Sequence, residues 1–233
     1  MFKNKLFVGL FCVVLLLSLC VSTVSAATTV NLTTTPANVY GKSAKDIMPG
    51  SVSPSTLTPN LPILSINLPV TPFVQTAQPW CNDLMKTANL SIGGYGCALT
   101  DATMVTYFYG NTATNPRVFN IAQGNYACPL DWWQIPNCGG YGYISSIDTI
   151  VASPTADQVI SICRNALQAG EPVIVGYQKH PTSEHYLLVK AVYNYGTQLS
   201  DFYCIDPLDG STYSLSSVVG SLAFTKAVCY YKK

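Results

Sequence analysis

Charge and histidine are scarce in this sequence of 233 residues. Lysine and arginine number 12, aspartate and glutamate 11 and histidine only 2, so charged residues make up 10% of the chain. No basic stripe is present, which argues against a nucleic acid partner. No Cys-x-x-Cys pair is present either, and His180 and His185 are not spaced as joint ligands on one element, so we expect no metal site. The glycines at Gly93, Gly94 and Gly96 lack the lysine of a phosphate-binding loop, and we expect no cofactor.

Long apolar runs are missing after the first 26 residues. Leu6 to Val21 is such a run, and it follows Lys3 and Lys5 and precedes a small-residue cleavage site, so residues 1–26 are predicted to be a signal peptide. Without it, ten basic residues face eleven acidic ones, and the net charge is −1. No later segment is apolar and long enough to span a bilayer. We expect a secreted, extracellular protein, either free or associated with the cell wall, with lipidation at Cys20 as a minor alternative.

Seven cysteines follow the predicted signal peptide: Cys81, Cys97, Cys128, Cys138, Cys163, Cys204 and Cys229. Exported thiols tend to pair, and because seven is odd, at least one is free or bonds another molecule. If Cys97 is the free one, up to three disulfides form, of unknown connectivity. A bond between Cys128 and Cys138 would close a loop around Trp132 and Trp133.

The composition divides the rest of the chain into two parts. Residues 27–76 are rich in threonine and proline and are predicted to be a spacer or a pro-segment, of which 61–70 is apolar enough to pack on the domain. Residues 77–233 are predicted to fold as one domain. Its periodicity predicts helices over 97–109 and 156–169, the second with a capping box from Thr155 to Gln158. Strands are predicted at 172–177, 185–193, 199–205 and 222–231, and helices followed by antiparallel strands indicate the α+β class.

Cys97 ends a glycine-rich run and begins the first predicted helix. The free N–H groups of a first helical turn and the helix dipole favour an anion, so we expect a lowered pKa and a reactive thiolate at Cys97. The plainer alternatives are a buried structural thiol and a disulfide partner.

His185 and Asp206 lie at the open end of one predicted hairpin. If its turn is centred near Tyr195 and Gly196, residues whose numbers sum to about 391 face each other, and His185 then meets Asp206. A carboxylate there would orient the imidazole and stabilise its charged form. The alternatives are a structural histidine and an aspartate of a plain Asp-Pro turn.

Five segments together resemble the peptidase family related to the double-glycine peptidases of bacteriocin exporters, a group of papain-like cysteine peptidases. They are Gln78–Trp80, Ile92–Thr100, Pro172–Gly176, His185–Val189, and Ile205–Pro207 with Gly210. The resemblance implies a papain-like fold with N-terminal helices packed on an antiparallel sheet. It also implies Cys97 as nucleophile, His185 as general base and then acid, and Asp206 as orienting residue. An upstream glutamine would donate to the oxyanion hole, with Gln78 as the match and Gln75 as the less favoured substitute.

The sequence therefore predicts a secreted cysteine peptidase that hydrolyses amide bonds through a thioester acyl-enzyme. Its expected substrate is a protein, a peptide or a cell-wall peptide. Two alternatives stay open. The same fold would serve as a non-catalytic surface-binding module, for which Trp132 and Trp133 are the better groove candidates, or the acyl group would pass to an amine instead of water.

Overall fold

The computed structural model describes residues 63–233, so the predicted signal peptide and most of the predicted spacer lie outside the described residues. The strands are β1 (Leu64–Asn67), β2 (Leu84–Met85), β3 (Leu90–Ser91), β4 (Ile144–Ala152), β5 (Val173–His180), β6 (Ser183–Asn194), β7 (Phe202–Ile205), β8 (Thr212–Ser214) and β9 (Phe224–Lys232). The α-helices are α1 (Ile92–Tyr95), α2 (Cys97–Phe108), α3 (Pro116–Gln123), α4 (Ala156–Gln168) and α5 (Leu215–Val219). Short 3-10 helices are η1 (Gly124–Tyr126), η2 (Trp132–Asn137) and η3 (Leu199–Asp201). None of the helices within 63–233 has the length and apolar character needed to cross a membrane.

An antiparallel sheet forms the framework. Its strand order is β4-β9-β5-β6-β7-β8, and β1 also pairs with β6. The mixed α/β architecture with an antiparallel sheet is compatible with the predicted α+β class. Because Leu64–Asn67 pair with residues 191–194 of β6, the folded unit extends upstream of the domain boundary expected at residue 76.

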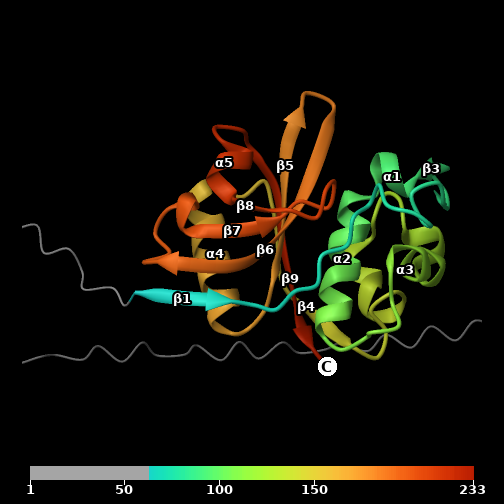
Figure 1. Cartoon of the computed structure of the whole chain (residues 1–233), viewed down its shortest axis with the longest axis horizontal. Coiled ribbons are helices and arrows are strands. Elements are labelled where there is room, and N and C mark those ends of the chain that lie inside the picture. Colours follow the sequence, from blue (N-terminus) through green and yellow to red (C-terminus); the bar gives the residue numbers. More distant parts are fainter. Residues whose placement is uncertain (1–62) are drawn as a thin grey trace, which may run out of the picture. The chain divides into compact units, whose positions relative to one another are not determined.

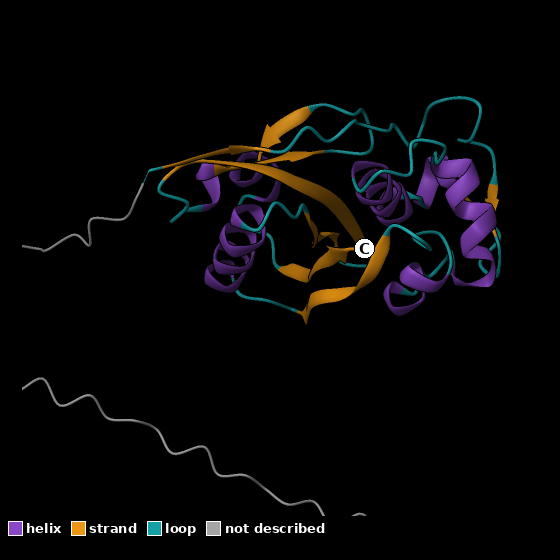
Figure 2. Ribbon diagram, turned by 90° about the horizontal axis from the view of Figure 1, so that it is seen from below, coloured by secondary structure: helices purple, strands orange, loops and turns teal. Residues whose placement is uncertain are grey.

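Both faces of the sheet are buried, and neighbouring residues of its central strands serve two different cores. In β6, Leu188 packs in the core that contains α2, whereas Leu187 and Val189 pack in the core that contains α4. This alternation is the period of a pleated strand. Figure 1 shows α1, α2 and α3 on one side of the central strands and α4 with α5 on the other, and the second view shows the strands running between these helix groups (Figure 2). Helix α2 therefore packs against one face of the sheet.

The local helix signals correspond closely to the structure. The capping box of α4 is confirmed: the Thr155 hydroxyl accepts from the Gln158 N–H at 3.2 Å, and the Gln158 side chain accepts from the Thr155 N–H at 2.8 Å. Helix α2 begins at Cys97 and ends at Phe108, one residue before the predicted end.

The hairpin after β6 differs from the prediction in its first residues. Leu199–Asp201 form η3 instead of strand, because the Asp201 carboxylate accepts from the Thr197 N–H at 3.0 Å and holds the turn. The pairs Val192↔Phe202 and Ala191↔Tyr203 sum to 394, an irregularity follows between Ala191 and Val189, and the pairs Val189↔Cys204 and Leu188↔Ile205 sum to 393, so the register predicted at 391 was wrong by two to three residues. A slip of two residues keeps side chains on the same face of a sheet, whereas a slip of one reverses it.

Candidate active site

Local packing fixes the position of Cys97, which is the first residue of α2. The side chain of Ser91 caps α1 by accepting from the Gly94 N–H at 3.2 Å, and α1 leads through Gly96 directly into α2. A Cβ atom at Gly96 would lie 2.6 Å from the Ile92 carbonyl oxygen, so only glycine permits this close approach. The sulfur of Cys97 therefore stands on the first turn of a helix that packs against the sheet.

His185 and Asp206 are hydrogen-bonded to each other. The His185 Nε2 atom lies 2.8 Å from Asp206 Oδ1, and both side chains are largely buried. The same oxygen accepts from the Leu208 N–H at 2.9 Å, and the ring of Tyr177 packs edge to face on the imidazole at 5.8 Å. These contacts fix the plane of the imidazole and leave its Nδ1 atom for a second partner.

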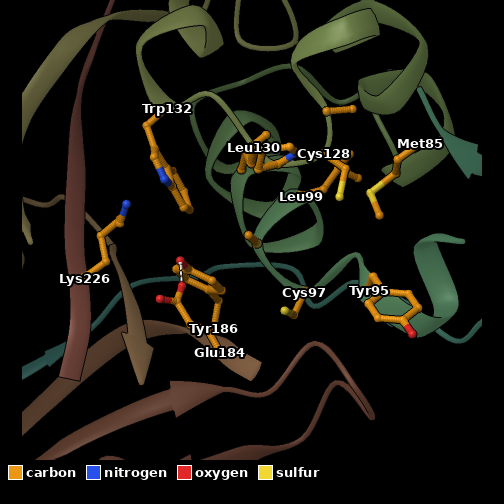
Figure 3. A pocket seen from close by; sticks show the side chains of 13 residues that line it. Met85, Tyr95, Cys97, Leu99, Cys128, Leu130, Trp132, Glu184, Tyr186 and Lys226 are labelled. Atoms are coloured by element: carbon orange, nitrogen blue, oxygen red, sulfur yellow. Dashed lines mark hydrogen bonds between the residues drawn. The ribbon is translucent and has the colours of Figure 1, made fainter. Parts of the chain in front are cut away.

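Two cavities meet at Cys97. One, of about 410 Å³, is lined by Cys97 and His185 and by polar groups that include Gln75 and Lys179. The other, of about 290 Å³, is lined mainly by apolar side chains: Met85, Leu99, Leu130, Trp132 and Tyr186. Figure 3 shows this apolar cavity, with Cys97 and Tyr95 at one end and Trp132 facing Tyr186 at the other. Thus Cys97 and His185, 88 positions apart in the numbering, share one cavity wall.

The structure places the two candidate glutamines differently. Gln75 is buried at 2% exposure and lines the polar cavity with Cys97, and its amide donates to the Gly93 carbonyl at 3.0 Å. Gln78 is exposed, and its amide points to the sulfur of Cys81 at 3.1 Å. Gln78, the predicted match, is not among the residues that line either cavity at Cys97. The geometry therefore favours Gln75 as the glutamine beside the sulfur.

The expectation of a lowered pKa at Cys97 was wrong. Burial raises the pKa of the Cys97 thiol to about 12, and the charge of Asp101 acts in the same direction. A backbone hydrogen bond at Tyr186 of β6 lowers it, as do those at Ala98 and at Cys97 itself, but together they do not outweigh desolvation. Only the contributions of Ala98 and Cys97 are the helix-start effect expected from the sequence. The thiol is 9% exposed and neutral in the resting structure.

Three features of the site were not predicted from the sequence. Asp101 lies one turn into α2 and is fully buried, although a carboxyl at position i+4 from Cys97 was visible in the sequence. The position of Gln75 beside Cys97 and the apolar cavity both depend on tertiary packing, which no local sequence pattern predicts. Of the two tryptophans considered as groove residues, Trp132 lines that cavity, whereas Trp133 is 63% exposed.

The predicted disulfides are not formed in the structure. All seven cysteines in the described part of the chain are free thiols, including Cys128 and Cys138.

One group of side chains within residues 63–233 has the spacing of metal ligands: the ligand atoms of Asp148, Glu171 and Cys229 lie within 4.8 Å of one another. The thiol of Cys229 already contacts Asp148 at 3.1 Å, and this group lines a different cavity from the two at Cys97.

Comparison with known proteins gives no family assignment: no protein-family model matches the sequence, and no curated protein is similar enough to match it.

Proposed function

We propose that the protein is an exported cysteine peptidase with a papain-like arrangement of Cys97, His185 and Asp206. One observation carries the proposal: His185, which is hydrogen-bonded to Asp206, lines the same cavity as Cys97, and Cys97 stands at the start of a helix. The packing of α2 on an antiparallel sheet supports the papain-like part of the proposal, and the predicted signal peptide supports export.

In the proposed reaction, His185 takes the thiol proton as the sulfur attacks an amide carbonyl. Because the resting thiol is neutral, proton transfer accompanies attack and no thiolate is stored beforehand. A C–S bond forms, the C–N bond breaks, and His185 returns the proton to the leaving amine. Water then attacks the thioester, gives one proton to His185 and releases the carboxylic acid and the thiol. Asp206 holds the imidazole ring in orientation through its hydrogen bond to Nε2.

The negative oxygen of the intermediate needs two hydrogen-bond donors. The backbone N–H of Cys97 belongs to a first helical turn, where no intrahelical carbonyl is available. The amide of Gln75 uses one N–H on the Gly93 carbonyl, so the second N–H is left for the oxyanion. Each such donor contributes about 2.7–4 kcal/mol to the transition state of acyl transfer.

The positions of the two cavities give the substrate a direction. His185 must protonate the leaving amine, and it lines the polar cavity but not the apolar one. The leaving part of the substrate therefore occupies the polar cavity, and the acyl part lies toward Trp132 and Leu130. We expect cleavage of peptides that carry a bulky apolar side chain on the acyl side of the scissile bond.

The experiment uses peptides of mixed sequence and cell-wall peptide fragments. Wild type is compared with Cys97→Ala, and Cys138→Ala serves as the matched control because Cys138 does not line either cavity at Cys97. Mass spectrometry identifies the products. New free amines and carboxylates made by wild type and Cys138→Ala, but not by Cys97→Ala, support hydrolysis. The same peptides left intact by every variant would refute it.

The buried, neutral thiol favours a second candidate, a non-catalytic surface-binding module. Such a module would bind a peptide or a wall polymer in the apolar cavity equally well with Cys97→Ala, without any new product. Acyl transfer to an amine is separated from hydrolysis by adding a primary amine, because the acyl product then gains the mass of that amine.

A further inference from the structure

Asp101 is a buried carboxyl group without a partner. Its exposure is 0%, and neither carboxylate oxygen has a hydrogen bond in the structure. The hydroxyl of the adjacent Thr100 is also buried and unpaired. Because residues at i and i+4 lie on the same face of a helix, Asp101 is stacked one turn behind Cys97. The proposed mechanism gives this group no role.

No positive charge compensates Asp101. Within residues 63–233 the ion pairs are Arg117–Asp83 and His185–Asp206, and neither includes Asp101. The titratable groups that act on it or respond to it are Cys97 on α2, Cys204 on β7 and Asp206 after β7. Burying a carboxylate without a cation is strongly unfavourable, so the neutral acid is the stable form. Burial and the charge of Asp206 both raise the pKa of Asp101 well above its usual value.

We propose that Asp101 is a positioning residue that sets the reactivity of Cys97 through its own protonation. The neutral acid leaves the sulfur free to give its proton to His185. The carboxylate, buried one helical turn away, opposes negative charge on that sulfur. Ionisation releases a proton to solvent and involves no other group. The inference rests on the proposed role of Cys97 as nucleophile, but its test does not need a substrate.

The coupling gives a distinctive pH profile. When Asp101 is neutral, the fraction of Cys97 thiolate rises tenfold for each pH unit. As Asp101 ionises, that rise stops, because each further ionised carboxylate makes the thiolate harder to form. Above this interval the thiolate fraction rises again with pH. It is then about tenfold lower than it would be with a neutral Asp101, because the like charge lies close to the sulfur.

The test measures alkylation of Cys97 by iodoacetamide from about pH 5 to about pH 10, with the modified cysteine identified by mass spectrometry. Wild type is compared with Asp101→Asn, which keeps the shape and cannot ionise. Asp157→Asn is the matched control, because Asp157 is exposed on α4. We expect the wild type and Asp101→Asn to react equally at low pH and the variant to react about tenfold faster at high pH. Parallel profiles across the whole range would overturn the inference.

A direct titration of the Asp101 carboxyl carbon by NMR in the wild type provides the second measurement, should Asp101→Asn fail to fold. A carboxyl that ionises at the pH of an exposed aspartate would also overturn the inference. The outcome is separable from the peptidase proposal. A changed alkylation profile without any hydrolysis refutes only the peptidase proposal, and hydrolysis that depends on Cys97 with parallel alkylation profiles refutes only the role of Asp101.

Discussion

Replacing Asp101 by asparagine should stabilise the protein, and the gain should grow with pH. The folded pKa of Asp101 is raised above 3.8 by burial, so the folded state holds this proton more tightly than the unfolded chain does. The favourable contribution is complete below about pH 3.8 and is lost as pH rises toward the folded pKa. Each pH unit in that interval lowers the free energy of unfolding of the wild type by about 1.4 kcal/mol. Asparagine is neutral throughout and suffers no such loss.

The assay is urea denaturation of wild type and Asp101→Asn at a series of pH values from about 4 upward. The difference in the free energy of unfolding should be near zero at the acidic end, increase by about 1.4 kcal/mol per pH unit and become constant above the folded pKa. Asp157→Asn, in which an exposed carboxyl is replaced, controls for loss of charge alone. A constant difference between Asp101→Asn and wild type at every pH would refute the reasoning, because it would mean that Asp101 is ionised in the folded state.

Three further predictions concern the oxyanion donor, the apolar cavity and the capping box of α4. Gln75→Ala should lower kcat for peptide hydrolysis by about 10²-fold, whereas Gln78→Ala should leave it unchanged, and equal losses would contradict the assignment of the oxyanion donor. Trp132→Phe should raise KM for peptides with a bulky apolar acyl side by about tenfold while Trp133→Phe does not, as measured by steady-state kinetics. Thr155→Ala should reduce the free energy of unfolding by about 1 kcal/mol in urea titrations, with no change in the alkylation of the site; an unchanged midpoint would show that the capping box is not stabilising.

Local physical rules explain which parts of the fold the sequence predicts well. The capping box at Thr155 and the glycine before Cys97 depend on residues within a few positions, and both mark helix starts in the structure. The His185–Asp206 contact depends on hairpin pairing, which is also local. The register differs from the predicted one and contains an irregularity between Val189 and Ala191, yet the two side chains meet, because both lie at the open end of the hairpin.

The electrostatics of the site could not be predicted in the same way. A helix start lowers the pKa of a thiol only by its backbone dipoles, and this contribution can be read from the sequence. The depth at which Cys97 lies and the burial of Asp101 follow from how α2 packs on β5 and β6. Desolvation depends on that depth and proved to be the larger effect. Burial thus reversed the sign of the predicted shift at Cys97, while the helix start itself was predicted correctly.

A high thiol pKa is compatible with nucleophilic chemistry when the base is buried beside it. Removing water penalises a lone thiolate, but it strengthens the attraction between a thiolate and an imidazolium by the same change in dielectric. His185 is 5% exposed, is held by Asp206 and lines the same cavity as Cys97, so in the proposed reaction it is placed to take the proton that Cys97 would lose. The thiolate is then favourable only together with the imidazolium and with a carbonyl in place to receive it. A buried, neutral thiol is also less prone to oxidation than an exposed thiolate, because susceptibility follows thiolate character and exposure.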